Sequence, residues 1–158
     1  MNICTRSPRR PPVPDGIVLR RLQPSDTQAL AGPGPRLAWI GDTWGGPRAL
    51  AASGHGWGAF AGPRLLSLAV SYIRGERFED LAVVTVPEHR RRGPAHACLA
   101  MLCAEVRDRS RRPTWTCSRG MNPGPAPVWT AGVQLARTYV HYAVGVPALP
   151  LPAAGSNR

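Results

Sequence analysis

A basic turn between a strand pattern and a helix pattern carries the clearest chemical signal in this sequence. Residues 83–95 read VVTVPEHRRRGPA, so an apolar, β-branched run ends at a proline and a helix begins close to Pro94. The first N–H groups of a helix have no acceptor inside it, and they lie at the positive end of its dipole. Three adjacent arginines, Arg90, Arg91 and Arg92, add positive charge. The turn therefore suits a phosphate-bearing ligand, and the alternative interpretation is a solvated basic connection.

Histidines and cysteines supply further reactive groups but do not predict a metal site. His89 and His96 flank the basic turn and are candidates for an acid or a base, with solvent-facing turn histidines as the alternative. Four cysteines stand at positions 4, 98, 103 and 117 without a C-x-x-C pair. This spacing predicts neither a disulfide framework nor a structural zinc site, so we expect no bound metal and small, buried cysteines.

The segment after the turn has the strongest helical pattern. Its apolar residues recur at helical spacing: Cys98, Leu99, Leu102, Cys103 and Val106. Pro94 suits the first helical position, where no N–H donor is needed. The pattern predicts a helix over 94–109 that packs on a sheet, with a run of arginines near its C-terminal end.

Several shorter patterns predict the sheet that positions this helix. Strands are expected at 17–19, at 56–60 and 65–73 as a hairpin with its turn at 61–64, at 78–86, at 114–118 and at 139–144. A helix start is expected at Pro24 and a brief helix near Pro127, while the Gly-rich stretch 31–56 resists assignment. The order predicts an α/β domain with a mixed, mostly antiparallel central sheet flanked by helices.

Proline-rich ends without periodicity flank the patterned region. We therefore expect flexible tails at 1–15 and 147–158 around one domain at 16–146. No apolar run approaches the roughly 20 residues that span a bilayer. No secretory signal pattern is present either, so we expect no membrane contact and a cytoplasmic location.

The charge is high and entirely due to arginine. The 158 residues contain 20 basic and 9 acidic residues, a net charge of +11, and no lysine. A basic chain is typical of nucleic-acid-binding proteins. The arginines are dispersed, however, and Arg, Ala, Gly and Pro share GC-rich codons, so a biased genome explains much of the charge. Nucleic acid is thus a less favoured partner.

The residues around the basic turn resemble the acetyl-CoA loop of the GNAT N-acetyltransferases. Arg90-x-x-Gly93-x-Ala95 follows a strand ending in Val84-Thr85-Val86-Pro87 and matches the R/Q-x-x-G-x-G/A pattern of that loop. Other similarities come in order along the chain: Glu79-Asp80, Pro113-Thr114-Trp115, Asn122 and Gly132-Val133. The run 78–115 looks most like the zwittermicin-resistance-type branch, and the resemblance covers about 16–146.

The resemblance implies a single GNAT-like domain that uses acetyl-CoA as co-substrate. The pantetheine arm would pair with the backbone of Val84, Thr85 and Val86, and the pyrophosphate would rest on amides between Arg91 and His96. The implied cofactor-binding set is Val84, Thr85, Val86, Arg90, Arg91, Arg92, Gly93, Ala95, His96 and Asn122.

The resemblance also implies a general base and a general acid. The base would be Asp80, with its neighbour Glu79 as the alternative, although both acids also suit ordinary surface ion pairs with Arg74 or Arg77. The acid has no clear position, because the segment where relatives carry a tyrosine is proline-rich here. Tyr139, followed by Tyr142, is the remaining candidate, with packing against the sheet as the alternative.

These features predict an N-acetyltransferase that acetylates an amine of a small molecule or a protein by direct attack in a ternary complex. The runner-up is a catalytically impaired module that binds CoA or a partner, because Pro94 removes one loop N–H and prolines interrupt 123–127. The acceptor site would involve residues 24–56, where Trp39 and Trp44 are equally suited to the core and to a pocket. A second copy of the chain, in a homodimer, is a further candidate partner.

Overall fold

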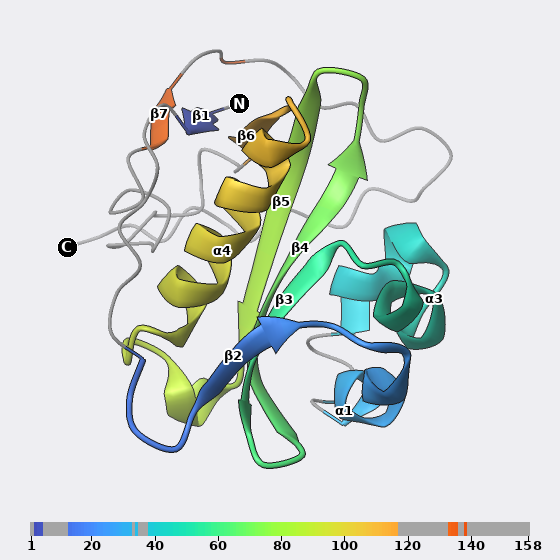
Figure 1. Ribbon diagram of the computed structural model, residues 1–158, viewed down its shortest axis with the longest axis vertical. Coiled ribbons are helices and arrows are strands. Elements are labelled where there is room, and N and C mark those ends of the chain that lie inside the picture. Colours follow the sequence, from blue (N-terminus) through green and yellow to red (C-terminus); the bar gives the residue numbers. More distant parts are fainter. Residues whose placement is uncertain are drawn as a thin grey trace, which may run out of the picture.

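Seven strands and a long helix form the framework of the computed structural model, which describes residues 2–4, 13–32, 34, 38–116, 133–135 and 138 (Figure 1). The strands are β1 (Asn2–Cys4), β2 (Val18–Arg21), β3 (Gly56–Ala61), β4 (Arg64–Arg74), β5 (Phe78–Thr85), β6 (Arg112–Trp115) and β7 (Val133–Leu135). The helical elements are η1 (Pro24–Asp26), α1 (Thr27–Ala31), η2 (Trp39–Trp44), α3 (Pro47–Ala52), η3 (Pro87–His89) and α4 (Pro94–Asp108).

The strands form one sheet in the order β2-β3-β4-β5-β6-β1-β7. Every neighbouring pair is antiparallel except β5 and β6, which are parallel. The β3–β4 hairpin turns at Gly62, whose φ of 56° is a left-handed conformation that glycine adopts without strain. The predicted α/β domain with a mixed, mostly antiparallel sheet is thus confirmed.

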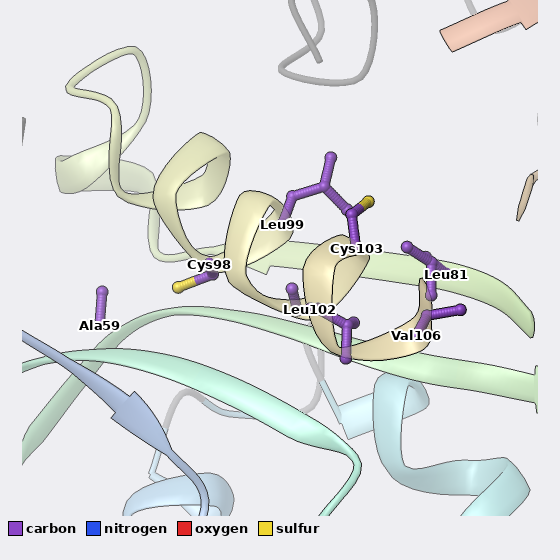
Figure 2. Close-up of a cluster of buried hydrophobic side chains, with 8 residues drawn as sticks. Ala59, Leu81, Cys98, Leu99, Leu102, Cys103 and Val106 are labelled. Carbon is purple, nitrogen blue, oxygen red and sulfur yellow. The ribbon is translucent and has the colours of Figure 1, made fainter. Parts of the chain in front are cut away.

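Helices cover both faces of the sheet, and a hydrophobic cluster lies beneath each layer. On one face α4 packs through Cys98, Leu102 and Val106 on Ala59 and Leu81, all buried (Figure 2). The other face carries α1, η2 and α3 over a cluster that contains Leu22, Ile40, Leu50, Phe60, Leu68 and Ala82. Neighbouring strand residues alternate between the two clusters, as strand geometry requires.

Helix α4 agrees with the prediction at its start and ends one residue earlier than expected. Pro94 occupies the first turn and its ring is fully buried, so the proline costs the helix no donor and fills the core. Cys98 and Cys103 are buried, and burial raises the pKa of the Cys98 thiol to about 12. Both behave as the small apolar residues that the sequence predicted.

The stretch 31–56 contains short elements that have no long periodic pattern. Gly45 and Gly46 have φ of 78° and 110° and connect η2 to α3. The indole of Trp44 stacks on His55 with ring centroids 5.4 Å apart, and its Nε1 donates to the carbonyl of Ser71. Trp44 thus packs against the core, whereas Trp39 is 42% exposed and meets Tyr72 edge to face.

Two differences from the expected elements concern the far edge of the sheet. Residues 2–4 of the expected N-terminal tail form β1, which pairs with β6 and β7. Strand β6 begins at Arg112 rather than at 114. The strand expected at 139–144 and the helix near Pro127 lie outside the described residues, so they and the domain boundaries stay predictions. No helix in the described part of the chain has the length and apolar character to cross a bilayer.

Candidate functional site

The basic turn reverses the chain sharply between β5 and α4. After η3, Arg91 has a φ of 59° and Gly93 a φ of 91°, both in the left-handed region. Such values favour glycine and are uncommon for other residues, so Gly93 is needed for the path of the backbone. Apart from Gly93 itself and its two chain neighbours, no heavy atom of the described residues lies within 4 Å of the position that a Cβ on Gly93 would occupy. The backbone at the start of α4 therefore faces open space, as a phosphate cradle must.

The start of α4 presents N–H groups to this space. Ala97 N donates to Gly93 O over 3.1 Å, which is the first hydrogen bond of the helix. The N–H groups of Ala95 and His96 precede it and have no acceptor within α4, while Pro94 has no N–H. Two first-turn amides and the helix dipole thus remain available for an anion.

The three arginines of the turn are exposed and differ in their contacts. Arg90 folds back toward β5, where its Nε donates to Thr85 O over 3.3 Å. Arg91 and Arg92 extend from the turn into solvent. The nearby acid Glu88 forms an exposed, loose ion pair with Arg64 at 3.8 Å. Because three arginines face one acid, the potential around the turn is positive.

One edge of β5 has no strand partner among the described residues over most of its length. The strand pairs with β4 as far as Thr85, which lies opposite Ser67. On its other side it pairs with β6 only at Phe78, Glu79 and Asp80. We call the backbone of Leu81–Thr85 on this side the open edge of β5. An extended ligand with amide groups can add to it by main-chain hydrogen bonds.

The side chain of Thr85 faces β4 rather than the open edge. Its Oγ1 lies 2.9 Å from Ser67 Oγ, and Ser67 Oγ also donates to Val84 O. The side chain of Val86 is buried, and its N–H donates to Leu66 O. A ligand contact of Thr85 thus falls to its main chain, as expected, whereas the main chain of Val86 is already bonded, since its carbonyl also accepts from His89 N.

The two adjacent carboxylates of β5 have different surroundings. Asp80 is half-buried at the point where β5 and β6 part, and its Oδ1 lies 3.0 Å from Thr114 Oγ1 and 3.2 Å from Thr116 Oγ1. Neighbouring strand residues point to opposite faces. Asp80 therefore shares a face with Ala82, under η2, whereas Glu79 shares the face of α4.

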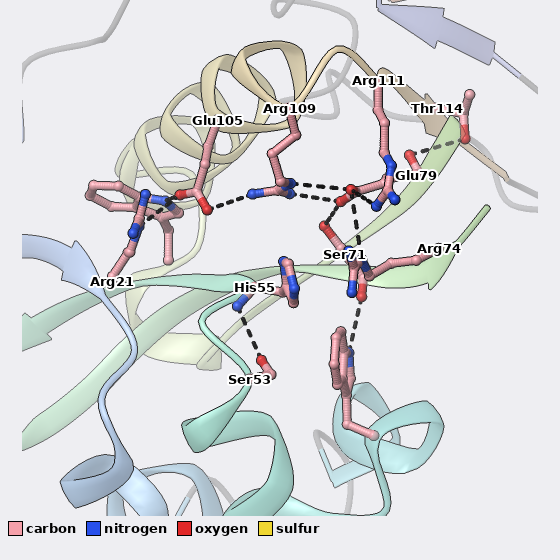
Figure 3. Close-up of polar contacts among 12 residues, drawn as sticks. Arg21, Ser53, His55, Ser71, Arg74, Glu79, Glu105, Arg109, Arg111 and Thr114 are labelled. Atoms are coloured by element: carbon pink, nitrogen blue, oxygen red, sulfur yellow. Dashed lines mark hydrogen bonds and ion pairs between the residues drawn. The ribbon is translucent and has the colours of Figure 1, made fainter. Parts of the chain in front are cut away.

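Glu79 is fully buried in a cluster of arginines (Figure 3). Arg109 Nη2 lies 2.8 Å from Glu79 Oε2, Arg111 Nη1 lies 2.9 Å from Oε1, and Arg74 Nε lies 3.7 Å from Oε1. Burial alone would raise the pKa of Glu79, but hydrogen bonds from Arg109, Ser71 and Arg111 outweigh it and lower the pKa to about 2. A carboxylate with so low a pKa is a weak base, so this geometry favours Asp80 over Glu79. The ion pair with Arg74 exists, and it joins a buried carboxylate to an arginine whose side chain is 34% exposed.

A second buried carboxylate, Glu105 of α4, continues this cluster. Its Oε1 accepts from Arg109 over 2.6 Å, and its Oε2 accepts from Trp57 Nε1 over 2.6 Å and from Arg21 Nε over 2.9 Å. Glu105 is not among the site residues predicted from the sequence. A signal was present, because Glu105 lies three residues after Leu102, within the apolar stripe of the helix.

The histidines beside the turn lie close to the candidate site. His89 is half-buried in η3. Burial lowers the pKa of His96, whose Nε2 is enclosed and has no hydrogen-bond partner within the described structure. His96 is therefore a neutral side chain at neutral pH, and its candidate contribution to a ligand is its main-chain N–H.

Two predicted site residues, Asn122 and Tyr139, lie outside the described residues, so their roles stay predictions. The same holds for Tyr142. Within the described residues, no group of three His, Cys, Asp or Glu side chains could hold a metal ion.

A cavity of about 540 Å³ lies on the α1 side of the basic turn. Its walls come from α1, from the β3–β4 turn and from the β5–α4 connection: Gln28, Ala29, Gly32, Pro63, Arg64, Leu65, Val86, Pro87 and Glu88. Among the predicted site residues that the structure describes, only Val86 lines this cavity, and neither the turn arginines nor Ala95 and His96 do.

Comparisons with known proteins agree with this arrangement. The family model described as GNAT acetyltransferase matches residues 13–124. A protein from Streptomyces virginiae named as an uncharacterised N-acetyltransferase is 46% identical over 107 residues, which are 66% of this chain and 45% of that relative. The chain thus spans about half the length of this curated relative.

Solved structures with low sequence identity share the fold. A GCN5-related N-acetyltransferase-like protein from Streptococcus suis has a TM-score of 0.61 at 18% identity, over 78% of this chain and 49% of its own. An aminoglycoside N-acetyltransferase in complex with CoA has a TM-score of 0.57 at 16% identity, over 85% of this chain and 100% of its own.

Proposed function

Because the chain belongs to the GNAT acetyltransferase family, we propose that it transfers an acetyl group from acetyl-CoA to an amine by direct attack in a ternary complex. The observation that carries the proposal is the open edge of β5 leading directly into the turn and the N-terminus of α4. This arrangement offers main-chain groups to an extended arm and amides with positive charge to a pyrophosphate. CoA contains both groups in that order.

Each part of the loop has its own role toward the bound co-substrate. The main chain of Val84 and Thr85, on the open edge, pairs with the pantetheine arm, whereas the N–H and the carbonyl of Val86 are bonded to Leu66 and His89. Ala95 N and His96 N donate to the pyrophosphate, and Gly93 leaves room for it, since beyond its chain neighbours no atom of the described residues lies within 4 Å of its Cβ position. Guanidinium groups of Arg91 and Arg92 add charge-assisted hydrogen bonds to phosphate oxygens.

The chain supplies a base for the amine. Acetyl-CoA, when bound, provides the acetyl group as a thioester and leaves as CoA. A new N–C bond forms as the C–S bond breaks, so the amine must give up a proton and the thiolate must gain one. Asp80 takes the proton from the amine, directly or through a water molecule. The donor to the thiolate stays a prediction, with Tyr139 as its candidate.

A small-molecule amine is the favoured acceptor class. Support comes from the CoA-bound aminoglycoside N-acetyltransferase that shares this fold, and a protein amine is the alternative. The finer assignment to the zwittermicin-resistance-type branch is part of the proposal and rests on the run 78–115 alone.

A thiol-release assay tests the proposed activity. The protein is incubated with acetyl-CoA and a panel of primary amines, including aminoglycosides and peptides with free amino groups, and free CoA thiol is measured. Amine-dependent release that is lost in Asp80→Asn supports the proposal. CoA binding without release for any amine supports the second candidate, a CoA-binding module, which the missing N–H of Pro94 favours.

A further inference from the structure

The carboxylate of Glu79 joins β5 to the end of β4 and to the connection between α4 and β6. It lies on β5 and binds Arg109 at the end of α4, Arg111 just before β6, and Arg74 at the end of β4 (Figure 3). Arg109 and Arg111 lie 30 and 32 residues after Glu79. Both ends of the short α4–β6 connection are therefore tied to a single buried carboxylate.

The main-chain pairing at this point is weak. β5 and β6 pair through only three residues of each strand, and the partner of Glu79 is Pro113. Alternate residues of β6 face β5 in this parallel ladder, and Arg112 N, which donates to Arg77 O, is one of the donors, so Pro113 stands at a position whose N is directed away from β5. One side-chain hydrogen bond, from Thr114 Oγ1 to Glu79 O, adds to this short ladder. The ion pairs of Glu79 supplement a junction that few main-chain bonds hold.

The same junction marks where the open edge of β5 begins. Pairing with β6 ends at Asp80, opposite Thr114, and the open edge starts at Leu81. The position of β6 at this point therefore sets where and how far the two strands part. The hydroxyl of Thr114 also contacts Asp80, so a shift of β6 would move a contact of the proposed base.

Glu105 is a matched carboxylate that lacks this connection. Both carboxylates are buried and both bind Arg109. The other partners of Glu105, Arg21 and Trp57, belong to β2 and β3 at the opposite side of the sheet from β6. Loss of Glu105 thus weakens the packing of α4 without loosening β6 from β5.

We infer, on the basis of the proposed function, that Glu79 is a positioning residue for the pantetheine arm of CoA. By holding Arg109 and Arg111 it keeps β6 beside β5 and fixes the point where the open edge begins. It touches neither CoA nor the acetyl group. Glu79 thus shapes the cofactor site and does not serve as an alternative base.

Calorimetric titration with two probes tests this role. CoA contains the pantetheine arm, whereas 3′-phospho-ADP is its nucleotide half and reaches only the turn and α4. Glu79→Gln keeps the size of the side chain and removes its charge. We expect it to weaken CoA binding by about tenfold, while the affinity for 3′-phospho-ADP changes by less than about twofold. Glu105→Gln should leave both affinities within about twofold.

Parallel losses for both probes, equal losses in both variants, or unchanged CoA affinity in Glu79→Gln would overturn the inference. If Glu79→Gln does not fold, as judged by circular dichroism, the same comparison with Arg111→Gln decides, because that variant removes one ion pair and keeps the bond to Arg109. Wild-type protein that binds neither probe would contradict the proposed function itself. Wild-type binding with an unaffected Glu79→Gln contradicts only the positioning role.

Discussion

Glu79 and Asp80 are neighbours on β5, yet Glu79 is fully buried among arginines whereas Asp80 is half-buried beside two threonine hydroxyls where β5 and β6 part. Strand alternation directs the two side chains to opposite faces of the sheet. One carboxylate is held ionised by its partners, and the other lies where the proposed reaction needs a base.

Asp80→Asn tests this division of roles. The amide cannot accept a proton, so we expect kcat to fall by about 100-fold or more, the usual range for loss of a general base. The affinity for CoA should stay within about twofold, since the substitution keeps the side chain's shape and leaves the turn unchanged. Thiol release and calorimetry measure the two quantities. A variant with the full rate would remove Asp80 from the mechanism.

The free energy of unfolding should fall at acidic pH, in part because Glu79 becomes protonated and loses its ion pairs. Its pKa is lowered to about 2 in the folded state from 4.5, so its stabilising effect is complete above pH 4.5 and is lost as the pH falls toward 2. Asp26, whose pKa the hydrogen bond from Arg20 lowers, acts in the same direction. Urea unfolding between pH 6 and 3 should show a smaller loss of free energy of unfolding in Glu79→Gln than in wild type. Parallel curves would contradict the low pKa.

The Gly93→Ala variant tests whether the pyrophosphate lies against Gly93, and a control variant accounts for the strain that alanine causes at a positive φ. At a φ of 91° an alanine costs about 1–2 kcal/mol, and its methyl group enters the space assigned to the pyrophosphate. Gly62→Ala is the matched control, because Gly62 also has a positive φ but lies in the β3–β4 turn. Both variants should lose stability in thermal unfolding, and only Gly93→Ala should lose CoA affinity. Equal CoA affinity in both would place the pyrophosphate elsewhere.

If the arginines of the turn contact the ligand, removing a positive charge from the turn should weaken CoA binding more than removing a charge elsewhere. Arg92→Gln should weaken CoA binding by about fivefold, or about 1 kcal/mol, with a smaller effect at high salt. Arg48→Gln removes the same charge from an exposed position on α3 and should leave CoA affinity unchanged. Equal effects of the two variants would show that net charge, and not the turn, attracts the ligand.

The long elements and the basic turn were predictable because their signals are local. Helix α4 has a regular apolar stripe, and the β3–β4 hairpin has two strand patterns around Gly62-Pro63. The stretch 31–56 was not predictable, because its elements are short and its path depends on positive-φ glycines. Strand β1 has only three residues, and its partner β6 lies far away in the sequence. No local sequence pattern therefore predicts β1.

The candidate site was partly predictable for the same reason. The motif from Arg90 to Ala95 lies in one stretch of sequence, and the structure places it at the start of a helix as expected. The difference between Glu79 and Asp80 could not be predicted, because it depends on Arg109 and Arg111, which only the folded chain brings to Glu79. The sequence likewise does not show that Glu105 shares Arg109 with Glu79.

Thermal unfolding with and without acetyl-CoA tests the central claim most directly. At about 100 times its dissociation constant the ligand should add about 2.7 kcal/mol to the free energy of unfolding. For a chain of this size that raises Tm by about 5–10 °C. An unchanged Tm at millimolar acetyl-CoA would contradict both the proposed acetyl transfer and the assignment of the turn as a CoA site.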